Sequence, residues 1–485
     1  MSAILIKITM NKRNLSFGQL FNLSFGFFGV QIAYALQSAN ISRIFATLGA
    51  DPHQLSFFWF LPPLMGMIVQ PIIGILSDKT WFGKIFGRRK FYLLVGALIA
   101  VVVMVLLPNA GDFTFEQRVM LGLNSAMWFG LFSLMFLDTS INIAMQPFKM
   151  MVGDMVNEEQ KGKAYAIQSA LCNAGSVVGY LFPIFFTWIG IANEAPEGVI
   201  PDSVKWSFYC GAAILILCSL YTFAVVREMD PKEYAEFHGL NEKKEEKAEN
   251  TANKGRIIRA FITVGLVQFF CWAAFLYMWT YSNGALAINC FGWDGINAKD
   301  IAFQDAGNWV GVVFCVQAVG SLIWAAFLPK LEHWLGNKGA YAVSLVVGAL
   351  GFISIYFVGD LAPQYDATIV TDGVATTSTI TLVLLKSKYV VWGSYFLIGA
   401  AWAAMLALPF TIITNAISGS KYMGALLGLF NCTICIPQIV ASFSGKPLLN
   451  YAYTYTPANP QAGMLILAGI LLLCGAACVF LIKEK

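Results

Sequence analysis

The chain has 485 residues, of which 58% are hydrophobic and only 12% are charged, and its formal net charge is +4 at pH 7. Soluble domains carry about 25% charged and about 45–50% apolar residues, so the composition excludes an ordinary soluble protein and indicates one that crosses a membrane several times. Nucleic-acid binding, which needs a basic patch on a soluble domain, is not expected. The composition therefore predicts that the protein is embedded in a lipid bilayer, which is its expected partner.

Apolar segments recur along the chain in two sets of six, separated by a charged stretch. A helix that crosses a bilayer needs about 20 predominantly apolar residues. The first set lies at 18–40, 55–77, 91–108, 121–150, 163–191 and 205–226, and the second at 257–290, 306–329, 339–358, 389–416, 422–444 and 461–482. We therefore predict an all-α membrane protein with twelve transmembrane helices, in an N-terminal six-helix bundle (residues 1–226) and a C-terminal one (residues 257–485).

Two hydrophilic interruptions stand out. Residues 227–256 have mixed charges and no apolar periodicity, which predicts a charged, partly helical linker. The threonine and valine content of residues 359–388 favours a small hairpin. If both termini are cytoplasmic, most of the 31 lysines and arginines fall on the cytoplasmic side, as the positive-inside rule requires. We therefore expect a protein of the inner or plasma membrane with both termini in the cytoplasm.

Asp138 lies alone in the middle of an otherwise apolar predicted helix. A carboxylate at mid-bilayer costs a few kcal/mol even on lenient scales of membrane insertion, so such residues face a cavity or a partner. Lys149 follows eleven residues later, which places it within about 20° of the same helix face and roughly 16 Å along the axis. The pattern predicts one ionisable helix face without a direct ion pair.

The sequence offers no constellation typical of catalysis or of metal binding. His53, His238 and His333 lie far apart, so we expect no metal site. The ten cysteines are scattered along predicted helices, and the Cys432–Cys435 pair lies inside an apolar helix, where both residues are interpreted as small apolar side chains. The sequence also lacks a G-x-x-x-x-G-K-[ST] phosphate loop. We expect no cofactor and no enzymatic activity.

Ordinary positive-inside charge would explain the basic residues of the segment GILSDKTWFGKIFGRRKF (74–91). It would not explain the defined spacing of Gly74, Asp78, Gly87 and Arg88. The segment resembles the cytoplasmic loop motif of the major facilitator superfamily, and its longer spacing is similar to that of plant sucrose transporters and their animal and bacterial relatives. The resemblance implies the major facilitator fold. It also implies gating roles for Asp78, Arg88 and Arg89, since in that family acid and arginine pair across helices in the outward-open state and part on inward opening.

Further segments are similar to the sucrose-transporter-like branch, which includes bacterial maltose and sucrose transporters and relatives among the glycoside-pentoside-hexuronide:cation symporters. They are GVQIAYALQSANI (29–41), LDTSINIAMQPFK (137–149) and NCTICIPQIVAS (431–442). Lys149 stands where the branch usually has arginine, so the charge is kept but the rigid bidentate fork is lost. Tyr281 stands where relatives carry an acid. The resemblance therefore leaves Asp138 as the candidate proton carrier, with Lys149 expected to favour proton release.

Amide and aromatic side chains in the predicted helices are candidates for a sugar site, because pyranose rings offer apolar faces for stacking and hydroxyl groups for hydrogen bonds. For each of them, hydrogen bonding between helices is an equally good interpretation, and Trp279 could also be an aromatic of the membrane interface. The candidates are Gln31, Tyr34, Gln37, Asn142, Gln168, Asn173, Trp279, Tyr281, Asn431 and Gln438.

The resemblance implies a proton-coupled symporter that imports a neutral sugar by alternating access, with an α-linked disaccharide such as maltose or sucrose as the expected substrate. We expect the protein to act as a monomer. Three alternatives remain at this point: a sodium-coupled sugar symporter, a membrane sugar sensor that does not transport and that signals through residues 227–256, and a polytopic membrane enzyme.

Overall fold

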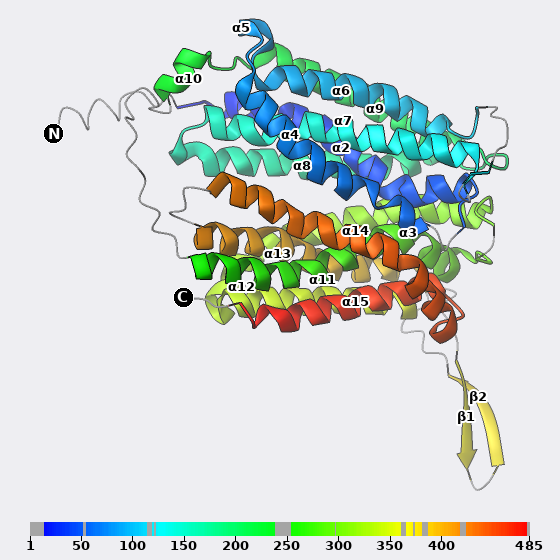
Figure 1. The fold of residues 1–485 in the computed structure, drawn as a ribbon. Coiled ribbons are helices and arrows are strands. Elements are labelled where there is room, and N and C mark those ends of the chain that lie inside the picture. The colour runs from blue at the N-terminus through cyan, green and yellow to red at the C-terminus, as the bar shows by residue number, and fades with distance from the viewer. Residues whose placement is uncertain are drawn as a thin grey trace.

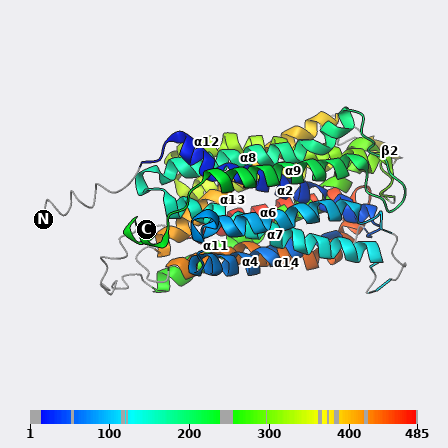
Figure 2. The same ribbon diagram turned by 90° about the horizontal axis from the view of Figure 1, so that it is seen from above.

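The fold is a bundle of long helices that run side by side (Figures 1 and 2). The computed structural model describes residues 14–51, 55–113, 119–120, 123–237, 254–295, 297–359, 365–371, 374–380, 387–417 and 423–482. In the first half of the chain the long helices are α2 (Phe17–Thr47), α4 (Leu61–Lys79), α6 (Arg89–Leu106), α7 (Ser125–Met155), α8 (Glu158–Trp188) and α9 (Asp202–Val225). In the second half they are α11 (Lys254–Leu286), α12 (Ile301–Ser354), α13 (Val391–Ile417), α14 (Met423–Tyr455) and α15 (Pro460–Val479).

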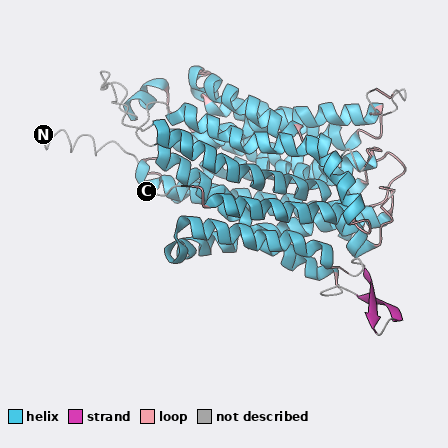
Figure 3. Cartoon of the chain, turned by 60° about the horizontal axis from the view of Figure 1, so that its bottom comes forward, coloured by secondary structure: helices cyan, strands magenta, loops and turns pink. Residues whose placement is uncertain are grey.

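Short elements mark the two ends of the bundle. We call one end the linker end, because it carries α5 (Gly83–Phe86) and α10 (Pro231–Phe237). The other is the hairpin end, where α3 (Leu55–Phe58) lies and where β1 (Tyr365–Thr371) pairs antiparallel with β2 (Val374–Ile380), as expected for 359–388 (Figure 3). Single turns occupy Leu107–Asn109, Ala287–Phe291, Ile355–Phe357 and Lys388–Val390.

Helix α12 crosses the bundle twice. Its 54 residues would make a straight helix of about 80 Å, whereas the hydrocarbon core of a bilayer is about 30 Å thick. Gly336 interrupts it with φ 69° and ψ 168°, a conformation open essentially to glycine alone. The turn at Gly336 divides α12 into two membrane-length segments, which correspond to the predicted helices at 306–329 and 339–358.

Ten helices within the described part of the chain are long and apolar enough to cross a membrane, with α12 counted once. Helix α2 is not among them although it has 31 residues. Its polar side chains, including Gln31, Gln37 and Asn40, are buried in the protein. Helix α2 and the second segment of α12 correspond in position to the predicted helices at 18–40 and 339–358. The prediction of an all-α membrane protein is confirmed, with the β1–β2 hairpin as an addition.

The helices pack as two groups that follow the order of the chain. Helices α2 to α9 contact mainly one another, and so do α11 to α15; Figure 1 shows the first group above the second. Contacts between the groups come chiefly from α2 with α11 and α12, α4 and α3 with α14, and α8 with α12. These five helix pairs join the two groups, so a site formed between the groups is built from helices of both.

Close packing of α6 on α7 depends on Gly96, and this gives a testable prediction. A Cβ atom at Gly96 would lie 2.6 Å from the backbone nitrogen of Ala144 and 2.8 Å from the carbonyl oxygen of Ser140. We expect Gly96→Ala to lower the midpoint of thermal unfolding of the purified protein in detergent. Gly153→Ala is the matched control, because a Cβ there meets nothing within 4 Å and alanine is favoured over glycine inside a helix by about 1 kcal/mol. Equal unfolding midpoints for the two variants would contradict this view of the α6–α7 contact.

Candidate functional site in the middle of the helix bundle

Asp138 lies in the middle of α7 and is only 2% exposed. Its Oδ1 atom accepts a hydrogen bond of 2.5 Å from Nε2 of Gln37 on α2. The second carboxyl oxygen, Oδ2, is buried, and so is Oε1 of Gln37; neither has a hydrogen-bond partner among the described residues. Burying an ionised carboxylate with an unpaired oxygen is costly, so this surrounding favours the protonated, neutral form of the group.

Neighbouring amides tie Asp138 to the surrounding helices. One turn further along α7, Asn142 donates a hydrogen bond of 2.8 Å to the backbone carbonyl of Asp138. Its own Oδ1 accepts a hydrogen bond of 2.7 Å from Gln70 of α4. Tyr34, one turn before Gln37 on α2, lies within electrostatic range of Asp138. Three predicted site residues, Tyr34, Gln37 and Asn142, thus gather around the predicted proton carrier.

The side chain of Lys149 lies near helices of both groups. Its side chain is exposed, yet it lies within electrostatic range of Cys172 on α8 and of Cys435 on α14. Lys149 is therefore a solvent-accessible cation close to helices of both groups. Tyr34 interacts with the same two cysteines, so Lys149 and Tyr34 face a common region between the groups.

A row of tryptophans runs from the contact between the groups into the second group. Trp59, between α3 and α4, stacks on Trp279 of α11 with ring centroids 5.8 Å apart. Trp279 contacts Trp402 of α13 at 6.0 Å, and Trp402 contacts Trp272 at 5.7 Å. Trp279 is buried at 8% exposure, so it belongs to the protein interior and not to an interfacial belt. Sequence reasoning missed Trp59, Trp272 and Trp402, because aromatic residues in apolar helices carry no positional signal.

The remaining predicted binding residues make hydrogen bonds mainly to groups outside the Asp138 cluster, or are buried elsewhere. Gln31 accepts from Ser176 at 3.5 Å, and Gln168 donates to the carbonyl of Phe148 at 3.0 Å. Asn173 and Gln438 each donate to a carbonyl one turn earlier in their own helix. Tyr281 is fully buried and Asn431 is half-buried on α14. The structure does not join these six residues to the cluster around Asp138 by any of these hydrogen bonds.

The predicted gating residues meet at the linker end. Arg89 is 2% exposed, and it contacts Asp78 of α4 at 2.5 Å and Asp154 of α7 at 2.8 Å. Arg88 lies 3.9 Å from Asp154 and stacks over the ring of Tyr234, 4.0 Å from its centroid. The acid–arginine pair therefore forms through Arg89, and it joins α4, α6 and α7 within the first group of helices.

Glu228 completes this cluster, although sequence reasoning assigned it only to the linker. Its carboxylate accepts hydrogen bonds from the backbone N–H groups of Arg88, Arg89 and Lys90, at 2.6 to 3.0 Å. These N–H groups lie at the start of α6, and the side chain of Arg88, its N-cap residue, makes no capping hydrogen bond. A carboxylate at a helix N-terminus is stabilised by the unpaired N–H groups and by the helix dipole. The end of the first six helices is thereby attached to the start of α6.

Gly87 makes room for Glu228, which predicts a difference between two similar glycines. Gly87 has φ 65°, and a Cβ there would lie 2.5 Å from Oε1 of Glu228. Gly83 also has a positive φ, 80°, but its Cβ would meet nothing within 4 Å. We expect Gly87→Ala to lower the thermal unfolding midpoint of the purified protein more than Gly83→Ala does. Equal losses would mean that backbone conformation alone requires glycine at position 87.

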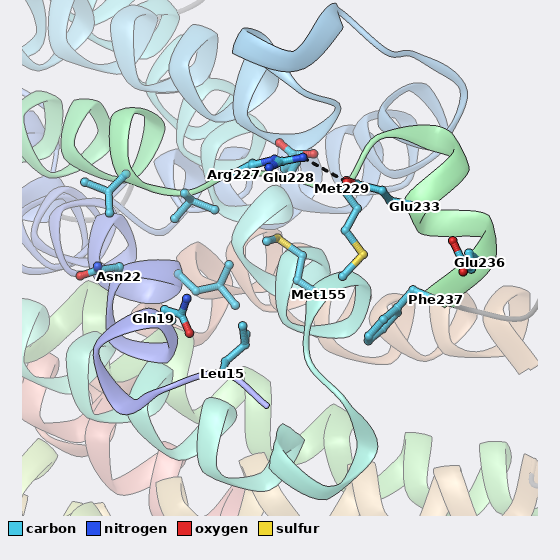
Figure 4. Close-up of a pocket in the computed structure, with 13 residues that line it drawn as sticks. Leu15, Gln19, Asn22, Met155, Arg227, Glu228, Met229, Glu233, Glu236 and Phe237 are labelled. Carbon is cyan, nitrogen blue, oxygen red and sulfur yellow. Dashed lines mark hydrogen bonds and ion pairs between the residues drawn. The ribbon is translucent and has the colours of Figure 1, made fainter. Parts of the chain in front are cut away.

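A pocket of about 560 Å³ opens at the linker end, close to this cluster (Figure 4). The start of α2, the end of α7, residues 225–229 and α10 line it, and Arg227 bridges to Glu233 across it at 3.0 Å. Met155, its contribution from α7, is 17 residues from Asp138, about 25 Å along the helix. The pocket is therefore separate from the candidate site. Residues 238–253 of the predicted linker, and His53, lie outside the described residues.

Comparison with known proteins identifies one protein family and similar transport proteins. The family model described as Major Facilitator Superfamily matches residues 23–442. Sucrose transport protein SUT5 of Oryza sativa subsp. indica is 23% identical over 461 residues, which cover 87% of this chain and 80% of that protein. The Membrane-associated transporter protein of Mus musculus is 21% identical over 395 residues, 70% of this chain and 73% of the mouse protein.

Solved structures share the fold. The inward-open xylose transporter XylE from E. coli has a TM-score of 0.58 at 14% identity and covers 93% of both chains. The nucleoside transporter NupG has a TM-score of 0.59 at 14% identity, covering 96% of this chain and 99% of its own. At these identities the likeness concerns the arrangement of the helices.

Proposed function

Because the chain belongs to the Major Facilitator Superfamily, we propose that it imports a neutral sugar together with protons by alternating access. An α-linked disaccharide such as maltose or sucrose is the proposed substrate. The name of the sucrose transport protein, similar over most of this chain, supports the sugar class, as do the tryptophan row and the amides near the middle of the bundle. The protein is an integral membrane transporter, and we propose that its substrate is this sugar and its coupling ion the proton.

The proposal of proton coupling rests on the residues that surround Asp138. Its Oδ1 atom is bonded to Gln37, while Oδ2 is buried without a described partner. A bound proton would remove the charge, which the described neighbours pair at Oδ1 alone. In the proposed cycle, Asp138 takes up a proton from the outer side and sugar binds between the helix groups. Both are released when the opposite end opens.

The moving parts of the proposed cycle are the two six-helix bundles, residues 1–226 and 257–485, joined by residues 227–256. We place the linker end and both termini in the cytoplasm, and the hairpin end outside. Lys149 faces the space between the bundles and would favour proton release when that space hydrates. A proton that falls through about 100 mV contributes about 2.3 kcal/mol, which corresponds to an approximately 50-fold sugar gradient.

Uptake of radiolabelled sugar by purified protein in proteoliposomes tests the proposal. Unfolding midpoints measured with a panel of mono- and disaccharides first identify the sugar, since a ligand that binds only the folded state stabilises it in proportion to RT ln(1 + [L]/Kd). We expect accumulation when the outside is acidic, with no requirement for sodium. Accumulation driven by a sodium gradient at equal pH would replace the proton by sodium, and sugar binding without any flux would indicate a sensor.

A further inference from the structure

Arg43 of α2 is a buried arginine at the hairpin end, with 1% of its surface exposed. Its Nε donates to Oε1 of Gln304 at 2.6 Å, and its Nη1 donates to Oδ1 of Asn308 at 2.9 Å; both acceptors are on α12. Its Nη2 donates to Oδ1 of Asn193, in the loop between α8 and α9, at 2.7 Å. A buried guanidinium is stable only when its donors are paired, so the closed hairpin end supplies the acceptors that this charge needs.

The orientation of the three amides is fixed by their other hydrogen bonds. Nε2 of Gln304 donates to Thr47 at 3.0 Å, Nδ2 of Asn308 donates to Thr187 at 2.8 Å, and Nδ2 of Asn193 donates to Asp305 at 2.9 Å. Because each nitrogen is engaged elsewhere, each amide oxygen is directed at Arg43. An amide network of this kind is specific for one relative position of its helices.

Most of these bonds cross between the two helix groups. Arg43, Asn193, Thr47 and Thr187 belong to the first group, whereas Gln304, Asn308 and Asp305 belong to the second, so five of the six bonds described join one group to the other. Gly307 of α12 supplies the space, since a Cβ there would lie 2.6 Å from Cδ of Arg43. All five bonds must break if the groups separate at this end.

We propose that Arg43 and its three amide acceptors form a lock that holds the hairpin end closed and so sets the balance between the two access states. Opening this end exposes the guanidinium and the amides to water, which replaces the lost hydrogen bonds. The lock acts through the relative position of the helix groups and touches neither Asp138 nor the tryptophan row in the contacts described. It is therefore independent of which sugar or ion is carried.

The test measures the distance between the groups at each end by pulsed electron paramagnetic resonance on the full chain in nanodiscs. Spin labels on noncanonical amino acids, which avoid the ten native cysteines, replace Glu197 and Lys299 at the hairpin end, where the two side chains form an exposed ion pair at 2.5 Å. A second pair replaces Lys163 of α8 and Lys330 of α12 at the linker end. We expect Arg43→Met to increase the population with a long hairpin-end distance about tenfold or more, as the loss of several charge-assisted bonds requires, and to shorten the linker-end distance.

Two further variants keep the test decisive. Lys205→Met is the matched control, because Lys205 is also a cation at the hairpin end but pairs at 2.6 Å with Asp112 inside the first group; its distances should stay unchanged. Gly307→Ala keeps Arg43 and crowds it only in the closed state, so it should shift the distances in the same direction as Arg43→Met, even if the latter is poorly folded. Unchanged distances in Gly307→Ala or in folded Arg43→Met, or the same shift in Lys205→Met, would overturn the proposal.

Discussion

Asp138→Asn protein should lose concentrative sugar uptake under an imposed proton gradient and keep the exchange of sugar across the membrane. Asparagine has nearly the shape of a protonated aspartic acid, and its Oδ1 can still accept the hydrogen bond that Gln37 donates to Asp138. The fold and the sugar site should therefore persist, whereas no proton can leave the group. Accumulation, about 50-fold at 100 mV for one proton, should fall to equilibration.

The measurement is uptake into proteoliposomes with and without the gradient, together with counterflow against preloaded sugar. Asp202→Asn is the control, because Asp202 is an exposed carboxylate at the hairpin end, and it should leave both activities intact. Concentrative uptake by Asp138→Asn would remove Asp138 from the coupling mechanism. Loss of counterflow along with accumulation, in folded protein, would assign Asp138 to sugar binding instead.

Arg89→Met should be the most damaging change in the cluster at the linker end. Arg89 is buried between the carboxylates of Asp78 and Asp154, and its removal leaves two acids facing each other without a cation. Breaking a fully buried pair costs about 3–5 kcal/mol; because the side chain of Asp78 is 56% exposed, solvent screening reduces the expected loss to about 1–3 kcal/mol.

Arg88→Met is the matched control for this prediction. Arg88 lies 3.9 Å from Asp154, a distance at which a partly exposed pair contributes less than about 1 kcal/mol. The unfolding midpoint in detergent and the initial rate of sugar uptake should both fall further in Arg89→Met than in Arg88→Met. Equal effects of the two changes would show that the total positive charge of the loop matters, and not the particular pair.

Much of the fold follows from the sequence, because bilayer-spanning helices require long apolar runs that hydropathy detects. The predicted segment at 91–108 corresponds closely to α6 (Arg89–Leu106). Helix ends were less predictable: α2 was predicted to stop at residue 40 but continues to Thr47. Its last turns carry polar side chains that other helices bury, and the window of apolar residues that reveals a membrane span does not register such turns.

The reach of local sequence patterns also explains which site residues could be predicted. Asp138 was identifiable because a lone acid in an apolar helix is anomalous, and Asp78, Arg88 and Arg89 because they lie in a segment that resembles a family motif. Arg43 lay beyond the predicted end of its helix and looked like an ordinary loop cation. Its role depends on Gln304 and Asn308, more than 250 residues further along the chain, and no local pattern announces such a contact.

The most direct test of the central claim, that sugar and protons move together, is the pH inside proteoliposomes when sugar is added outside. The vesicles contain a trapped pH indicator, start with equal pH on both sides, and have their membrane potential clamped by potassium and valinomycin. We predict that sugar entry acidifies the interior in the unmodified protein and that Asp138→Asn abolishes this acidification. Sugar entry without acidification, or acidification that persists in Asp138→Asn, would contradict the account.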